Sequence, residues 1–164
     1  MKKLVCIIFL VVFATGLKAQ EKQRAIGIRG GLSSGIEYRV FTSEHSSYKA
    51  LLSTRNGGLQ LVGLKEFHEP GIFDFSDQMS LIYGFGIHVG YECWDKVKDH
   101  SNYVYTENRT SPVAGLDGLA GVEYNFWEAP LSLGFEVKPF FDLFGRKFIR
   151  IQPFDFAFTL KYNF

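Results

Sequence analysis

Apolar and polar residues alternate along most of this chain, and turn residues separate the alternating stretches. The last stretch, PFDFAFTLKYNF, shows the pattern clearly, because every second residue from Phe154 to Phe164 is apolar. The residues between them, such as Asp155 and Lys161, are small or polar. A period of two places successive side chains on opposite faces of a β-strand. The pattern therefore predicts strands with one apolar and one polar face.

Eight such stretches follow one another, and no helical period interrupts them. Asn56-Gly57 lies between the third and the fourth and is typical of a tight hairpin turn. In the fourth stretch the alternation loses its phase near residues 62–64, which predicts a β-bulge. Residues 92–114 and 140–152 are expected to be connections, the first of them long and polar. The predicted strands span residues 25–32, 36–41, 48–55, 58–68, 80–91, 115–126, 131–139 and 153–164.

The polar faces of these strands carry charges of both signs, whereas the opposite faces are almost wholly Ile, Leu, Val, Phe and Tyr. A soluble binding barrel would point the apolar faces inward, but a barrel in an outer membrane inverts this order. Closure satisfies every backbone hydrogen bond, as a bilayer demands, and strands of about 9–11 residues match its thickness. The sequence predicts an all-β fold, an eight-stranded antiparallel up-and-down transmembrane β-barrel. Its predicted interior charge network comprises Arg29, Glu37, Arg39, Glu92, Asp117, Glu123, Glu136, Lys138, Asp155 and Lys161, with Lys49 and Arg55 on the same polar side.

The first residues of the chain have the pattern of a secretory signal peptide. Lys2 and Lys3 precede an uninterrupted apolar run from Leu4 to Ala14, and Ala19 is a small residue at the expected cleavage site. The run is too short for a transmembrane helix, which needs about 20 apolar residues; an uncleaved anchor is the alternative. We therefore expect a cleaved signal peptide at residues 1–19 and a single barrel domain at residues 20–164.

Charge and cysteine content exclude several classes of function. Removal of residues 1–19 leaves 15 basic and 17 acidic residues, without the basic excess of a nucleic-acid-binding protein. Cys93 is then the one remaining cysteine, so neither an internal disulfide nor a cysteine-based metal site is expected. Gly84, Gly86 and Gly90 approach a dinucleotide-binding pattern, but that motif needs a following helix and none is predicted. No cofactor is expected.

The signal peptide, the eight alternating segments and the terminal FTLKYNF resemble the small eight-stranded outer-membrane β-barrel proteins of Gram-negative bacteria, the OmpA/OmpX-like and porin-like barrels. The resemblance implies a monomer in the cell outer membrane, in contact with its lipid. It also implies that the outer-membrane barrel insertion machinery reads an assembly signal at the end of the chain. The residues that match this signal are Phe158, Leu160, Tyr162 and Phe164.

Function is less clearly encoded than fold. The leading hypothesis is a structural or surface-interaction role without catalysis, with residues 92–114 as a surface-exposed candidate for ligand binding through Trp94, Tyr103 and Tyr105. A lipid-modifying enzyme of the lipid A deacylase or acyltransferase type is the alternative, with His88 or His68 near interior acids such as Glu92 or Glu123. A narrow transport channel is third, because the interior of an eight-stranded barrel is just wide enough for side chains to fill.

Overall fold

A computed structural model describes residues 24–55, 57–73, 76–100, 103–145 and 149–164, with the side chains of residues 96–106 left undescribed. The predicted signal peptide at residues 1–19 and its cleavage site lie outside the described residues. No helix in the described part of the chain is long and apolar enough to cross a bilayer. The strands are β1 (Arg24–Gly31), β2 (Ser34–Ser43), β3 (Ser46–Arg55), β4 (Gly58–Pro70), β5 (Met79–His100), β6 (Tyr103–Asn125), β7 (Leu131–Val137), β8 (Phe140–Phe144), β9 (Arg150–Gln152) and β10 (Phe156–Asn163).

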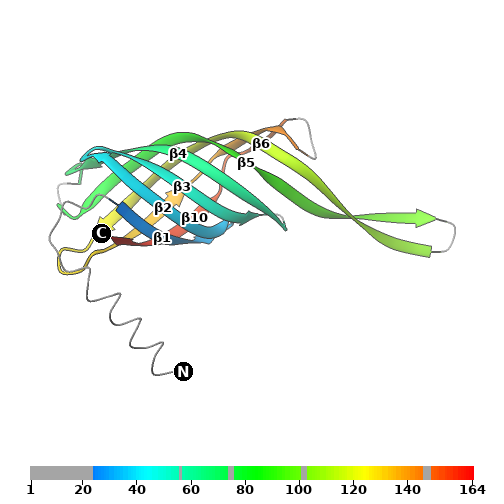
Figure 1. Ribbon diagram of the computed structural model, residues 1–164, viewed down its shortest axis with the longest axis horizontal. Helices are drawn as coiled ribbons and strands as arrows, with labels where there is room; N and C mark the ends of the chain where they lie inside the picture. The colour runs from blue at the N-terminus through cyan, green and yellow to red at the C-terminus, as the bar shows by residue number, and fades with distance from the viewer. Residues whose placement is uncertain (1–23, 56, 74–75, 101–102, 146–148) are drawn as a thin grey trace, which may run out of the picture.

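These ten segments form a closed antiparallel barrel of eight strands (Figure 1). Strands β1 to β6 pair with their neighbours in chain order, β6 pairs with β7, β7 with β10, and β10 with β1. Strand β8 continues the course of β7 along β6, and β9 pairs with β8 ahead of β10. The predicted eight-stranded up-and-down barrel is therefore confirmed, with its last two strands each divided into two segments.

The apolar faces point outward and the polar faces point inward. On β1, Ile26 and Ile28 are exposed, whereas Arg29, the residue after Ile28, is 2% exposed. On β10, Phe158 is 65% exposed and Thr159 beside it is 1% exposed. A wall of exposed aliphatic and aromatic side chains around a polar interior is the arrangement of a lipid-embedded barrel.

The bulge predicted near residues 62–64 is absent, and that prediction is wrong. Strands β3 and β4 pair in unbroken register from Ser46 opposite Phe67 to Arg55 opposite Gly58. The alternation is obscured in the sequence because Val62 and Leu64 are apolar residues that face the interior. Within the described residues they form a small buried apolar cluster with side chains of β3, β5 and β6, namely Leu51, Ile82 and Leu119.

Residues 92–114 are not a loop, contrary to the prediction. Strands β5 and β6 remain paired from Met79 opposite Tyr124 to His100 opposite Tyr103. The pairing of β5 with β4 ends at Tyr91, and that of β6 with β8 ends at Ala114. The two strands therefore project past the barrel as a two-stranded ribbon, seen at one end of the molecule in Figure 1. We call residues 93–100 and 103–113 the β5–β6 ribbon.

Residues 140–152 were also expected to be a connection, and strands β8 and β9 occupy part of this span. Pro139 separates β7 from β8, because proline has no N–H to donate to a neighbouring strand. Its carbonyl still accepts a hydrogen bond from Gly118 N–H at 2.7 Å, so the wall continues across the break. This extension brings Asp142 and Arg150 to the barrel interior.

Candidate functional site

The centre of the barrel is occupied by a cluster of charged side chains contributed by seven of the strands. Four are acidic and four are basic, and each is at most 3% exposed. Every one occupies an inward position in the alternation of its strand, so the period of two in the sequence directly fixes the chemistry of the interior. The central cluster comprises Arg29 of β1, Glu37 and Arg39 of β2, Lys49 of β3, Glu66 of β4, Glu123 of β6, Glu136 of β7 and Lys161 of β10.

Among the acids of the central cluster, Glu136 contacts the most cations. Its carboxylate accepts hydrogen bonds from Arg29 Nη1 at 2.7 Å, Lys49 Nζ at 3.0 Å and Lys161 Nζ at 3.1 Å. These donors come from β1, β3 and β10, so a single carboxylate joins strands from separate parts of the wall.

Glu66 and Glu123 share Arg39 between them. Arg39 Nε lies 2.8 Å from Glu66, and its Nη1 lies 3.0 Å from Glu123. Lys49 Nζ lies 2.7 Å from Glu66, and Lys161 Nζ lies 2.6 Å from Glu123. Each of these acids therefore meets two cations, which offsets the cost of burying its charge.

Glycines next to the central cluster leave room for its long side chains. A Cβ on Gly134 would lie 2.6 Å from Thr159 Oγ1, and a Cβ on Gly27 would lie 2.8 Å from Lys161 Cγ. Gly86, part of the glycine pattern noted in the sequence, is required for a different reason. A Cβ at this position would lie 2.0 Å from the carbonyl oxygen of Gly63 on β4. It allows β4 and β5 to approach closely and shows no phosphate-binding geometry.

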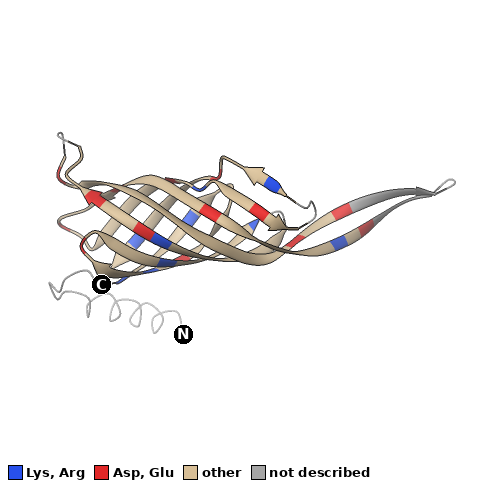
Figure 2. Ribbon diagram, turned by 90° about the horizontal axis from the view of Figure 1, so that it is seen from above, with Lys and Arg blue, Asp and Glu red and all other residues tan. Residues whose placement is uncertain are grey.

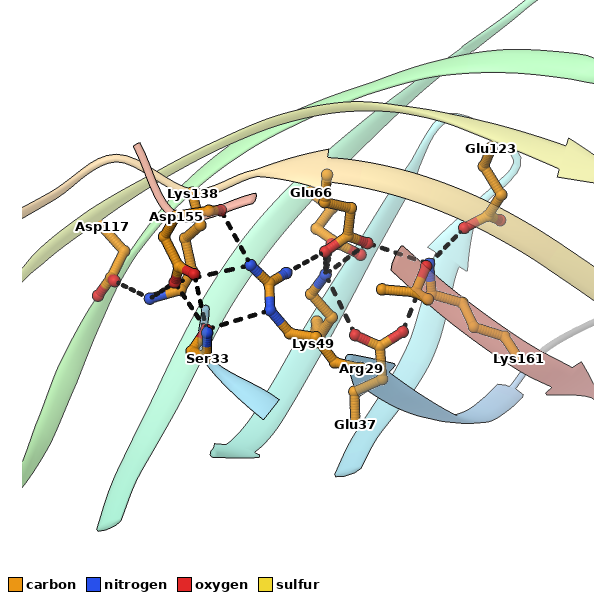
Figure 3. Close-up of polar contacts among 12 residues, drawn as sticks. Arg29, Ser33, Glu37, Lys49, Glu66, Asp117, Glu123, Lys138, Asp155 and Lys161 are labelled. Atoms are coloured by element: carbon orange, nitrogen blue, oxygen red, sulfur yellow. Dashed lines mark hydrogen bonds and ion pairs between the residues drawn. The ribbon is translucent and has the colours of Figure 1, made fainter. Parts of the chain in front are cut away.

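A second group of charged side chains lies between the central cluster and the base of the β5–β6 ribbon. Lys138 Nζ lies 2.8 Å from Asp117 and 3.6 Å from Asp155. Asp155 also accepts a hydrogen bond from the Ser33 hydroxyl at 2.6 Å. Arg29 lies 3.7 Å from Asp155 (Figure 3) and also pairs with Glu136, so it connects the second group to the central cluster.

His88 lies between two carboxylates in this second group. Its Nδ1 is 2.7 Å from Asp117 and its Nε2 is 3.1 Å from Asp142. Glu92 and Glu123 were predicted as partners of His88, and this prediction is wrong. Glu92 instead pairs with Arg150, whose Nε also lies 2.9 Å from Asp142. Because both ring nitrogens face acids, the imidazole has no nitrogen directed at a serine hydroxyl.

Two further interior groups have their own partners. His68 Nε2 lies 2.8 Å from the Ser47 hydroxyl. Arg55 stacks on Phe140, with 3.5 Å between the guanidinium carbon and the ring centroid. Among the described residues, no group of three or more His, Cys, Asp or Glu side chains is arranged to hold a metal ion.

The structure places all ten residues of the predicted interior charge network inside the barrel, each at most 4% exposed. It adds Glu66, Asp142 and Arg150, which were not predicted from the sequence. Glu66 keeps the inward alternation that starts at Gln60, so an uninterrupted period of two through β4 is the signal that identifies it. The interior charges therefore form two connected groups of ion pairs, with both signs along the barrel wall in Figure 2.

The residues of the proposed assembly signal lie on the outer face of β10, with Phe164 directly after the end of the strand. Phe158, Leu160 and Phe164 are 65%, 42% and 48% exposed, and Tyr162 is partly buried. Strand β10 lies between β1 and β7, at the place where the barrel closes. These side chains therefore face the surroundings rather than the charge clusters.

Comparison with solved structures finds a similar fold in the N-terminal β-barrel domain of Pseudomonas aeruginosa OprF. The two share a TM-score of 0.50 and 11% sequence identity, and the match covers 86% of this chain and 95% of that one. No family model and no curated protein matches the sequence. At this identity the likeness concerns the fold alone. The chain has the outer-membrane β-barrel fold, in its small, closed, eight-stranded antiparallel form.

Proposed function

We propose that this protein is an integral barrel of the cell outer membrane with a structural or surface-interaction role and no catalytic activity. The observation that carries the proposal is the pairing of an exposed apolar wall with an interior of mutually neutralising charges. Contact with lipid stabilises exposed apolar side chains such as Phe85, Phe158 and Ile87, whereas contact with water is unfavourable for them. The ion pairs fill the centre of the barrel and hold its strands together.

Membrane fractionation tests the location. Expressed with its first 19 residues in a Gram-negative host, the protein is expected in the outer-membrane fraction after density separation. It should resist extraction by salt and alkaline carbonate and should change gel mobility on heating. Recovery of the folded protein from the detergent-free periplasmic extract would overturn the proposal and favour a soluble barrel.

Conductance in planar bilayers tests the filled interior. The central cluster places four acids and four bases across the bore, so wild-type protein is expected to produce no steps of wide-pore size. A Glu136→Ala variant tests whether the cluster closes the bore. Large, frequent steps from the wild type would instead support the transport alternative.

The β5–β6 ribbon supports the surface-interaction part of the proposal. It is paired on neither outer edge by other described strands, and isolated two-stranded ribbons are marginal in water. Trp94 is half-buried and Asp95 and Arg109 are exposed near its base, a mixture suited to a surface ligand. Binding of the wild type to whole-cell or matrix ligands, compared with a ribbon-shortened variant, tests this role.

A lipid-modifying enzyme is the alternative, and lipid A profiles from cells with and without the gene discriminate between the two. We expect identical acyl patterns. A changed pattern that is lost on His88→Ala and retained on His68→Ala would replace the non-catalytic proposal with the enzyme.

A further inference from the structure

The outer wall of the barrel carries one cation in an otherwise apolar region. On β4 the outward positions run Leu59, Leu61, Gly63, Lys65 and Phe67, followed at the end of the strand by Glu69, which accepts a hydrogen bond from the Tyr83 hydroxyl. Away from the turns, the strand ends and the β5–β6 ribbon, Lys65 is the one charged side chain that the described residues direct outward. A charge on a lipid-facing wall costs several kcal/mol at the bilayer centre unless it reaches an interface or an opposite charge.

The contacts of Lys65 leave most of its hydrogen-bonding capacity unused. Its Nζ donates to the Thr42 hydroxyl at 3.3 Å and lies 4.2 Å from the centroid of the Tyr48 ring. An ammonium has three N–H donors, and no described carboxylate lies within ion-pair distance of this one. The amine is therefore positioned to receive an external anion.

Thr42 indicates the end of the barrel toward which the amine is directed. It lies two residues beyond Val40, which pairs with Arg24, and Arg24 exchanges backbone hydrogen bonds with Phe164. Lys65 therefore extends toward the end of the barrel that holds the chain's C-terminal residue. The β5–β6 ribbon projects from the opposite end of the barrel (Figure 1), and the proposed function gives the ribbon a role at the cell surface, so the end that holds Phe164 faces the periplasm.

An apolar groove of about 580 Å³ begins beside Lys65 on the same wall. Strand register explains its shape, because Ala50 of β3 lies directly opposite Gly63 of β4. This pair of small residues forms a depression between Tyr38 on β2 and Ile87 on β5. A Cβ built on Gly63 meets no atom within 4 Å, so the depression is open.

The row of residues next to this depression contains the cation. Tyr48 and Phe85 lie opposite Lys65 on the two neighbouring strands. The amine itself lies near the Tyr48 ring and 5.9 Å from the centroid of the Phe67 ring. An anionic group at Lys65 would thus continue into an apolar groove that runs away from Thr42, toward the middle of the wall. A membrane phospholipid has the matching arrangement, with a charged head group for Lys65 and an acyl chain for the apolar groove.

We propose that Lys65 and the Ala50–Gly63 groove form a binding site for one anionic glycerophospholipid of the leaflet that faces the periplasm. Its phosphate binds Lys65 Nζ and the Thr42 hydroxyl, and an acyl chain lies over Ala50 and Gly63. The proposal rests on the proposed function, since it requires the barrel to be embedded in a membrane. A net negative head group is favoured because Lys65 has no protein anion to neutralise it.

Native mass spectrometry of the refolded, delipidated barrel tests the site by titration with phosphatidylglycerol or phosphatidylcholine. Wild type should bind one phosphatidylglycerol about fivefold more tightly than the Lys65→Gln variant, the effect of about one lysine at a charged membrane surface. Gly63→Leu should fill the groove and weaken binding similarly while keeping the amine, which distinguishes a lipid from free phosphate. Arg24→Gln removes an exposed cation at the same end of the barrel and should leave the affinity unchanged.

Heat-dependent gel mobility in phosphatidylcholine vesicles keeps this result separate from the proposed function. If all four proteins fold in the vesicles but bind both lipids equally, the lipid site is wrong and the membrane barrel stands. If Arg24→Gln weakens binding as much as Lys65→Gln, the attraction is general and no site exists. Failure of the wild type to insert into any vesicle would overturn both proposals.

Discussion

Glu136 shows at the scale of single residues how the barrel interior accommodates many charges. Its carboxylate is fully buried and meets Arg29, Lys49 and Lys161 within 3.1 Å. Burial of any one of these ions alone would be unfavourable, and the cluster is stable because each charge has several opposite neighbours. Loss of one member therefore leaves its partners buried and uncompensated.

Glu136→Gln is expected to reduce the free energy of unfolding by about 3–5 kcal/mol, the usual cost of breaking a buried ion pair from one side. Urea unfolding of the refolded protein in lipid vesicles, followed by gel mobility, measures the change. Glu107→Gln is the matched control, because Glu107 pairs with Arg109 where both side chains are about 40% exposed. It should change the stability by about 0–1 kcal/mol. Equal effects of the two substitutions would show that the central cluster does not stabilise the barrel.

Phe158 and Thr159 are neighbours with opposite surroundings, and they test the inside-out order of the barrel. Phe158→Arg places a cation on the outer wall and should cost about 2–4 kcal/mol near mid-bilayer. Thr159→Ser keeps the hydroxyl that accepts a hydrogen bond from Lys161 Nζ at 2.9 Å and should be nearly silent. The folded fraction in outer membranes measures both. Normal membrane insertion of Phe158→Arg would contradict a lipid-facing position for this residue.

Individual residues also show what could be read from the sequence. The ten predicted interior charges all occupy positions in clean alternation, so a period of two was enough to place them inside. Glu66 was missed because Val62 and Leu64, which precede it on the inner face, are apolar. Ion-pair partners could not be predicted, because contacts such as Arg39 with Glu123 depend on how the sheet closes.

At the scale of elements, strands β5 and β6 combine two environments in one continuous pair. Within the barrel, up to Tyr91 on β5 and from Ala114 on β6, apolar and polar residues alternate because one face forms the outer wall and the other faces the interior. The β5–β6 ribbon has neither environment, so its sequence lacks the alternation and resembles a polar loop. Hydrophobic patterning detects burial rather than backbone pairing, and this explains why residues 92–114 were predicted as a connection.

Shortening the ribbon tests whether it is independent of the barrel. Replacement of residues 95–108 by Asn-Gly keeps Trp94 opposite Arg109 and supplies a favoured two-residue turn. Strands β4 and β8 pair with β5 and β6 only outside the replaced residues. The barrel should therefore fold with unchanged yield and a stability within about 1 kcal/mol of wild type. Heat-dependent gel mobility and urea unfolding measure this. A variant that fails to fold would mean that the ribbon is needed to form the barrel.

For the whole molecule, closure of the barrel joins the first and the last of the described strands. Strands β1 and β10 pair from Ala25 opposite Asn163 to Gly31 opposite Ala157. Lys161 of β10 then reaches Glu123 and Glu136 on the next two strands of the wall. The closing pair therefore completes both the backbone ladder and the central cluster, and contacts so distant in sequence form slowly. Assembly in cells should depend strongly on β10.

Phe164→Ala tests whether the end of β10 acts as an assembly signal. The N–H and C=O of residue 164 hydrogen-bond with Arg24 at 2.9 and 3.1 Å, and alanine keeps both bonds. The ring is 48% exposed, so its burial contributes little to the fold. We expect purified Phe164→Ala to fold in vesicles like the wild type, but to accumulate severalfold less in outer membranes of cells.

Ile26→Ala provides the matched control for this experiment, because it removes an apolar side chain of similar exposure from β1, opposite Tyr162. If the outer wall near this end of the barrel matters only through lipid contact, Ile26→Ala and Phe164→Ala should reduce the folded amount in cells equally. If the insertion machinery reads the outward residues of β10, only Phe164→Ala should do so, and its deficit should be absent with purified protein. If Phe164→Ala accumulates in outer membranes to the same level as the wild type, the terminal aromatic is not part of a signal. The apolar face of β10 would then serve lipid contact alone.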